Sequence, residues 1–233
     1  MSALGELLRE IPRPRRAAPP PEACPVVEET TPSGALVPFS HRDEQIQSLA
    51  HHLFFRHEHG MVRHVGFAPI EPSEATAKLC LDLATLLAAD GKYDVGLIEA
   101  GGTEFPLSAQ LNGPIPASLS TPWTIAPRLW IAPAESWWSH PGLRPAAGQN
   151  FLRLRDLFAK FHFSIVHCPP VSGLTLRLGR SCDGLVLVLT ANRTRRLVAA
   201  QVKDCLQKAA IPVLGTVLAE RRFPVPDRLY RKL

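Results

Sequence analysis

The segment Val65–Leu79 has the pattern of a buried strand, a tight turn and the beginning of a helix. Such a turn holds nucleotide phosphates when glycines let the backbone curl, a Lys contacts the terminal phosphates and a Ser or Thr hydroxyl binds Mg²⁺. The turn region Pro72–Lys78 has no glycine, and its one Lys comes last. The sequence therefore predicts the backbone of a phosphate-binding loop without the side chains that bind phosphate.

Two further polar residues come at the ends of apolar runs. Glu99 follows the predicted strand Val95–Ile98, and His167 ends the predicted strand Ser164–His167. A neutral His is a poor ligand for Mg²⁺, which prefers oxygen, whereas a Glu can hold a metal through one oxygen. A strand-end histidine that is hydrogen-bonded to a loop explains His167 equally well.

Other catalytic patterns are absent from the sequence. It has no Gly-x-Ser-x-Gly elbow, no His-Glu-x-x-His and no paired carboxylates in one run. Four histidines between His51 and His59 have no Cys or well-spaced carboxylate to complete a metal site, so a solvated helix face is the better interpretation. The Trp137-Trp138 pair indicates a packing patch. We expect no metal site.

Strands and helices alternate along most of the chain. The first helix is predicted to begin at Ser40 and to stop at Gly60. Apolar strands separated by amphipathic helices predict an α/β fold, doubly wound, with a mostly parallel sheet and helices on both faces. The predicted strands are Val62–Phe67, Val95–Ile98, Ser164–His167, Asp183–Leu189 and Val213–Leu218, and the later helices are Ser73–Ala89, Asn150–Phe161 and Thr194–Ala209.

The first 38 residues differ in composition from the rest. Ala3–Ile11 has Leu4, Leu7, Leu8 and Ile11 at helical spacing, and eight prolines follow between Pro12 and Pro38. This pattern predicts residues 1–38 as a flexible Pro-rich tail with a short amphipathic helix, and residues 39–233 as the folded domain. Such a tethered helix is suited to recruiting a partner, and a disordered tail with chance periodicity is the alternative.

Composition and charge indicate the cellular compartment and the class of partner. The 233 residues include five Cys without a CxxC pair, which favours a reducing compartment. With no signal peptide and no membrane-spanning apolar run, we expect a cytoplasmic protein that reaches a membrane through a partner or a basic surface. The region 193–233 has ten Lys or Arg against three acids, without interleaved aromatic residues. We therefore expect no nucleic-acid partner.

Three stretches in the second half carry a resemblance to a known family. Phe161–Val171, with its His-Cys-Pro-Pro, resembles a family strand that ends in Asp-Thr-Pro-Pro. Ser181–Leu189 resembles an Ala-Asp-Gly-Val strand, followed by Asn192–Arg195, and the ending Arg222–Leu233 resembles some exopolysaccharide members. Residues 42–233 thus resemble the cytoplasmic kinase domain of bacterial tyrosine autokinases of capsule and exopolysaccharide synthesis. These belong to the P-loop ATPases with a deviant Walker A motif, as do partition and septum-site ATPases.

The phosphate loop departs from the family pattern Pro-Gly-Glu-Gly-Lys-Ser-Thr. Only its Pro and Glu are kept, and the residues that bind phosphate and Mg²⁺ in the family are replaced. Pro72 and Glu74 match, Ser73 and Ala75 stand for the glycines, Thr76 for the Lys, Ala77 for the Mg-binding hydroxyl, and Lys78 comes two positions late.

The other family motifs are also altered. The Asp-x-Asp of the second motif is Glu99-Ala100-Gly101, and His167 replaces the Asp of the third. In the ring-assembly helix Glu44 is kept while Gln47 and Ala50 replace two arginines, and the tyrosine-rich tail is reduced to Tyr230, the one candidate phosphate acceptor. Each charge-assisted hydrogen bond contributes about 1.5–3 kcal/mol. These losses should therefore remove roughly two to four decades of nucleotide affinity.

The resemblance implies a non-catalytic regulatory or scaffold subunit of exopolysaccharide or capsule synthesis and export, without a cofactor. Its partner would be a polysaccharide co-polymerase or export membrane protein, or an active paralogous ATPase, bound through the Ala3–Ile11 helix, Glu44 or the basic C-terminal region. A homo-oligomer is also implied, although the missing arginines argue against a ring. One alternative is an active ATPase or autokinase that binds ATP or ADP with Mg²⁺ weakly, with Lys78 as the substitute Lys. Another is a partition-type positioning ATPase.

Overall fold

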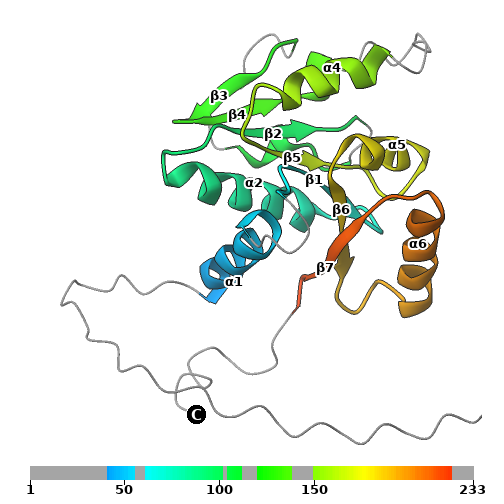
Figure 1. Ribbon diagram of the computed structural model, residues 1–233. Coiled ribbons are helices and arrows are strands. Elements are labelled where there is room, and N and C mark those ends of the chain that lie inside the picture. Colours follow the sequence, from blue (N-terminus) through cyan, green and yellow to red (C-terminus); the bar gives the residue numbers. More distant parts are fainter. Residues whose placement is uncertain (1–40, 56–60, 102–103, 112–119, 138–148, 222–233) are drawn as a thin grey trace, which may run out of the picture. The chain divides into compact units, whose positions relative to one another are not determined.

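The structure is a computed structural model that describes residues 41–55, 61–101, 104–111, 120–137 and 149–221 (Figure 1). The chain divides into two units, Met1–Pro38 and Phe39–Leu233, and all the described residues lie in the second. The predicted partner helix, with Leu4, Leu7, Leu8 and Ile11, and the candidate acceptor Tyr230 lie outside the described residues.

One seven-stranded sheet forms the centre of the fold, in the order β3-β4-β2-β5-β1-β6-β7. β3 is antiparallel to β4, and the other neighbouring pairs are parallel. This arrangement confirms the predicted α/β class with a mostly parallel sheet. The strands are β1 (His64–Pro69), β2 (Val95–Glu99), β3 (Trp123–Ala126), β4 (Leu129–Ala132), β5 (Phe163–His167), β6 (Gly184–Thr190) and β7 (Val213–Ala219).

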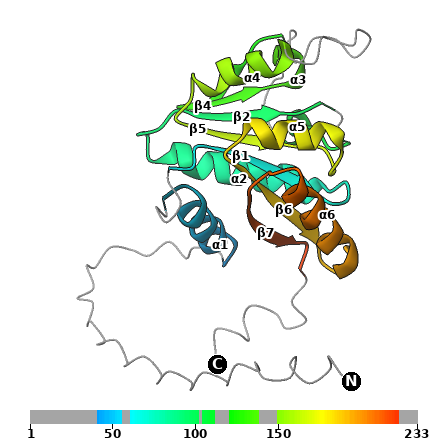
Figure 2. The same ribbon diagram turned by 45° about the vertical axis from the view of Figure 1, so that its right-hand side comes forward.

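Helices cover both faces of this sheet (Figures 1 and 2). On one face, α1, a π-helical turn and α2 pack on the strands, and on the other face the apolar core includes residues of α4, α5 and α6. The helices are α1 (His41–Ala50), the π-helical turn η1 (His51–Phe55), α2 (Glu74–Ala89), the 3₁₀ turn η3 (Leu107–Gln110), α3 (Ala134–Trp137), α4 (Gln149–Phe158), α5 (Gly173–Ser181) and α6 (Arg196–Lys208).

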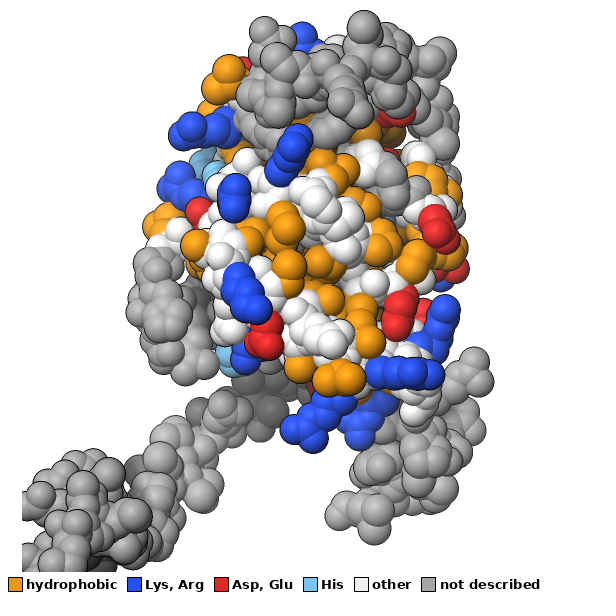
Figure 3. All heavy atoms as spheres, turned by 90° about the vertical axis from the view of Figure 1, so that its right-hand side faces the viewer, with side chains coloured by type: hydrophobic (Ala, Val, Ile, Leu, Met, Phe, Trp, Pro, Cys, Tyr) orange, Lys and Arg blue, Asp and Glu red, His pale blue; other side chains and the backbone are white. Residues whose placement is uncertain are grey.

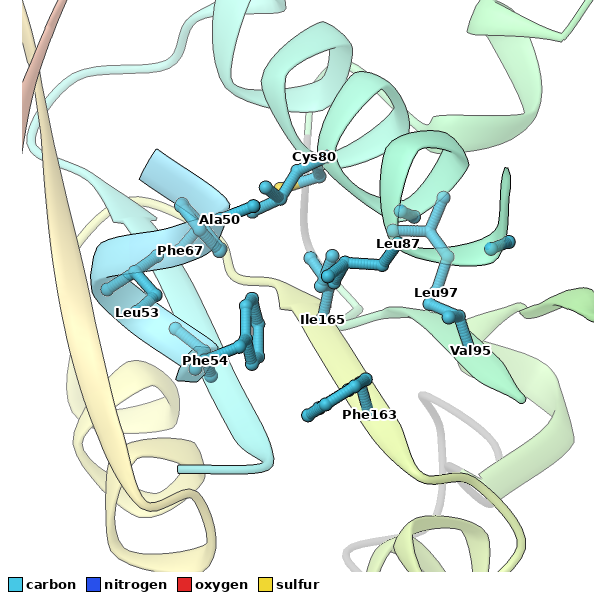
Figure 4. Close-up of a cluster of buried hydrophobic side chains, with 14 of the residues drawn as sticks. Ala50, Leu53, Phe54, Phe67, Cys80, Leu87, Val95, Leu97, Phe163 and Ile165 are labelled. Carbon is cyan, nitrogen blue, oxygen red and sulfur yellow. The ribbon is translucent and has the colours of Figure 1, made fainter. Parts of the chain in front are cut away.

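The core on the α2 face joins three parts of the chain that lie far apart in sequence. Figure 4 shows Leu53 and Phe54 beside Phe67 of β1, with Cys80 of α2 and Ile165 of β5 nearby. The ring of Phe54 meets the ring of Phe163 edge to face, with the ring centroids 5.0 Å apart. The strands β1 and β5 are buried on both faces, which explains why their sequences are almost continuously apolar.

Several elements differ from the sequence-based prediction. The first helix changes to a π-helical turn at His51, and residues 56–60 lie outside the described part. β3, β4, α3 and α5 were not predicted. The helical spacing of the sequence predicts that the inward side of α6 is formed by Val198, Val202, Cys205, Leu206 and Ala209. In the structure Val198 and Cys205 are exposed, and of this set only Leu206 is fully buried.

Candidate functional site

The loop between β1 and α2 lies at the carboxyl end of the central strand, where a phosphate loop was predicted. Ile70 donates its backbone N–H to the Val188 carbonyl at 3.2 Å, and Thr76 N–H donates to the Ser73 carbonyl at 3.2 Å. Ser73 occupies the N-cap position of α2 but makes no side-chain cap bond. Its buried hydroxyl donates instead to Oε1 of Glu220, after the end of β7, at 3.2 Å.

The first turn of α2 buries the positions that hold the Lys and the hydroxyl in the resembling family. Thr76 and Ala77 are both 0% exposed, and among the described residues the Thr76 hydroxyl has no hydrogen-bond partner. Lys78 lies on the exposed side, where its Nζ pairs with Oε1 of Glu74 at 2.9 Å and lowers the pKa of that carboxyl. The only Lys of the segment is therefore occupied in a surface ion pair one turn along the helix.

A second carboxylate is bonded into the same loop. Thr194, in the segment after β6, donates its hydroxyl to Oε2 of Glu71 at 2.7 Å and accepts the Thr190 N–H at 3.0 Å. Together with the Ser73–Glu220 bond, this contact links the loops that follow β1, β6 and β7. Two carboxylates are thus bonded beside the loop, and each would repel an anionic phosphate bound there.

Glu99 and His167 meet on the α2 face of the sheet. They are paired in register on β2 and β5, and their exposed fractions are 8% and 2%. The Glu99 carboxylate accepts the Leu107 N–H at 3.3 Å, and the Trp137 indole N–H donates to the Glu99 carbonyl at 3.0 Å. These bonds hold Glu99 against η3 and α3.

His167 is a neutral side chain in the core. Burial lowers its pKa to about 4, and its Nδ1 has no hydrogen-bond partner within the described part of the chain. Its backbone carbonyl accepts the Ala100 N–H at 3.0 Å, so the loop contact of this residue is made by the backbone. A neutral imidazole in this place cannot substitute for the carboxylate that positions Mg²⁺ in a phosphoryl-transfer site.

The remaining predicted positions are spread over the fold. Gly101 follows β2 and is half-buried, Pro72 is half-buried in the β1–α2 loop, and Ala75 faces the groove described below. Glu44 is exposed on α1. Within the described residues, no three His, Cys, Asp or Glu side chains come together as a metal site. In the same part of the chain, no helix combines the length and the apolarity needed to cross a bilayer.

Sequence reasoning missed three site residues and one groove. Glu71, Thr194 and Glu220 lie next to motifs that were noted, but no spacing rule connects them, because their contacts join loops more than a hundred residues apart. The groove, of about 950 Å³, lies between α1, the start of α2 and β7. Its apolar lining comes from Ile46, Leu49, Leu79 and Val217, and its charged lining includes Arg42 and Lys78.

Comparisons with known proteins identify the fold. No protein-family model matches the sequence, and no curated protein matches it. The chimerical protein CapA2B2 is similar in structure, with a TM-score of 0.62 and 18% identity over 77% of this chain and 84% of that chain. The kinase domain of VpsO is similar as well, with a TM-score of 0.56 and 20% identity over 78% of this chain and 100% of that domain.

A ParA family ATPase from Chlorobium tepidum TLS is also similar, with a TM-score of 0.57 and 14% identity over 73% of this chain and 78% of the ATPase. These likenesses show that the chain has a P-loop NTPase-like fold. They confirm the fold expected from the sequence resemblance. At identities of 14–20% they are likenesses of fold, and the chemistry of the site has to be argued from its residues.

Proposed function

We propose that this chain is a non-catalytic regulatory or scaffold subunit in the synthesis and export of a bacterial polysaccharide. The observation that carries the non-catalytic part is the pair of carboxylates that are hydrogen-bonded beside the phosphate loop. Glu71 is held by Thr194 and Glu220 by Ser73, while the nearest Lys pairs with Glu74 on the surface.

The missing groups matter because phosphoryl transfer depends mostly on positioning and on electrostatic stabilisation by Lys and Mg²⁺. In this chain Thr76 and Ala77 provide no cation and no exposed hydroxyl, and the neutral His167 provides no anionic ligand. Each absent charge-assisted bond costs about 1.5–3 kcal/mol, and the two carboxylates add repulsion to that loss. We therefore infer that the fold is kept while nucleotide turnover is lost.

The polysaccharide role is supported by the motifs that resemble the exopolysaccharide kinase family and by the VpsO kinase domain, which shares the fold. A subunit without its own chemistry acts through contacts. We propose as its partner a membrane-embedded polysaccharide co-polymerase or export protein, or an active paralogous ATPase. The chain would then work in the cytoplasm at the inner face of the membrane.

Calorimetry with Mg-ATP and Mg-ADP tests the non-catalytic assignment. We expect no binding heat up to millimolar nucleotide, and no difference between the parent chain and Lys78→Ala. A micromolar dissociation constant that is abolished by Lys78→Ala would overturn the assignment and would favour the active alternative.

Co-purification tests the scaffold assignment separately. The full chain is expected to retain a polysaccharide-export membrane protein encoded beside it, and a chain without residues 1–38 is expected to lose it. Retention that is undiminished by the deletion would reject the tethered helix as the contact. Failure of the full chain to retain any export protein or paralogous ATPase would reject the scaffold role itself.

A further inference from the structure

Helix α6 carries a large apolar side chain on its outer side. Leu197 is 70% exposed, whereas Leu206 is fully buried against the sheet. The two residues are nine positions apart, which is about two and a half helical turns, so they point in opposite directions. Leu197 therefore has no packing role in the described fold. Val198, beside it, is also exposed.

Three exposed arginines precede this leucine in the sequence. Arg193, Arg195 and Arg196 precede it immediately, all three are exposed, and none forms an ion pair with a described carboxylate. Residues 191–210 include five basic side chains and one acidic side chain, Asp204. Figure 3 views the side of the molecule that carries α5 and α6, and Lys and Arg side chains gather along its lower edge next to exposed hydrophobic ones.

The segment that presents these arginines is held in place by the loop contacts. The Thr194 hydroxyl bonds to Glu71 and accepts the Thr190 N–H, which fixes the backbone between Arg193 and Arg195. Asn192 adopts a left-handed backbone conformation, φ 62°, at the turn that leads into this segment. The basic groups are thus presented by an ordered turn, so less conformational entropy is lost when they bind a surface.

We propose that the first turn of α6 docks directly on an anionic phospholipid surface. Guanidinium groups form paired hydrogen bonds with phosphates, so Arg193, Arg195 and Arg196 would bind lipid headgroups. Leu197 would enter the interfacial region between them, as apolar side chains of interfacial helices do. A nucleic-acid backbone offers the same phosphates but leaves Leu197 in water, so the exposed leucine favours the membrane. The inference does not depend on the proposed polysaccharide role.

Vesicle co-sedimentation of the full chain tests the proposal. We expect binding to phosphatidylcholine vesicles that contain about a third phosphatidylglycerol, and little binding to phosphatidylcholine alone. The triple variant Arg193→Ala, Arg195→Ala, Arg196→Ala should bind the anionic vesicles about a hundredfold more weakly, since each basic residue near an anionic surface contributes roughly a factor of five. Binding should also weaken as salt is raised.

Matched variants distinguish binding by this surface from the effects of overall charge and hydrophobicity. Lys92→Ala, Arg155→Ala, Lys160→Ala removes the same charge from exposed positions elsewhere, and Leu152→Ser alters a leucine that is 60% exposed on α4. We expect Leu197→Ser to weaken vesicle binding and Leu152→Ser to leave it unchanged. Equal binding to neutral vesicles, or an equal loss in the control triple variant, would overturn the proposal. Binding to duplex DNA that is tighter than to vesicles and insensitive to Leu197→Ser would assign the surface to nucleic acid instead.

Discussion

Glu99 and His167 lie side by side, paired in register on the neighbouring parallel strands β2 and β5, and both are almost completely buried. In the resembling family, both positions belong to motifs built on Asp. In this chain one of them has become an imidazole whose Nδ1 has no partner. The pair places a titratable group in the core, and the stability of the protein should depend on pH because of it.

The free energy of unfolding should fall by about 3 kcal/mol between pH 6.5 and pH 4 through His167 alone. Its folded pKa of about 4 lies below the ordinary value of 6.5, so in this range the unfolded chain binds a proton that the folded chain does not. Stability is therefore fully present above pH 6.5 and is lost as the pH falls toward 4. His64, whose pKa is lowered by burial, contributes in the same direction.

Urea unfolding at a series of pH values measures this effect. His167→Leu should flatten the dependence between pH 6.5 and 4, while His162→Leu, at an exposed position, should leave it as in the parent. An unchanged slope in His167→Leu would contradict the assignment of the effect to this residue.

Restoring the family's Lys should destabilise this chain. Thr76 is 0% exposed, and Thr76→Lys would bury an ammonium group without a partner, at a cost of about 3–5 kcal/mol in the free energy of unfolding. Thr85→Lys, at an exposed position of the same helix, is the control and should cost less than 1 kcal/mol. Thermal unfolding with and without Mg-ATP completes the test. Recovery of the lost stability by Mg-ATP would show that the loop still binds phosphate.

Removing the charge of the two bonded carboxylates should let the loop bind anions. Glu71→Gln, Glu220→Gln keeps oxygens that can accept from Thr194 and Ser73 but removes the repulsion. We expect ATP binding, which should be undetectable in the parent chain, to become measurable in this variant, because the N–H groups at the start of α2 attract phosphate. Titration by calorimetry measures the change, with Glu104→Gln, Glu135→Gln as an exposed control pair. Equal gains in both variants would show that net charge alone is responsible.

Gly96 lies under an aromatic ring. A Cβ at this position of β2 would come within 2.3 Å of the Phe161 ring, so Gly96→Ala should lower the free energy of unfolding by about 2 kcal/mol. Gly215→Ala on β7 meets no atom within 4 Å and should be close to neutral. Urea unfolding compares the two, and similar midpoints for both variants would contradict the packing argument.

The sequence predicts β1, β2, β5, β6 and β7 well because each of these strands is a short apolar run between turns. The edge strand β3 does not follow this pattern and was not predicted, since none of its residues is fully buried. Helix α5 escapes for another reason: Leu174, Leu176 and Leu178 alternate as in a strand. The buried residues are Thr175, Leu178 and Gly179, at helical spacing, and Gly179 allows the close approach of Ile211 and Leu185.

Less of the candidate site than of the fold can be predicted from the sequence. The replaced residues of the phosphate loop can be read from the sequence, because that motif is contiguous. The carboxylates bonded beside the loop cannot be read in this way, because Glu71 contacts Thr194 and Ser73 contacts Glu220 only after β1, β6 and β7 are assembled side by side. The burial of His167 likewise depends on its neighbours across the sheet. Long-range pairing decides these features, and spacing along the chain does not.

The hydrogen bonds from Thr194 to Glu71 and from Ser73 to Glu220 bear on when the domain can change its conformation. In a nucleotide-driven switch, the loops after the central strands are released and recaptured in each cycle as the terminal phosphate leaves. Here the same loops are fastened to one another by the chain's own side chains. Under the proposed function, a domain built in this way would change its conformation when a partner or a membrane surface binds it, and not through a nucleotide cycle of its own.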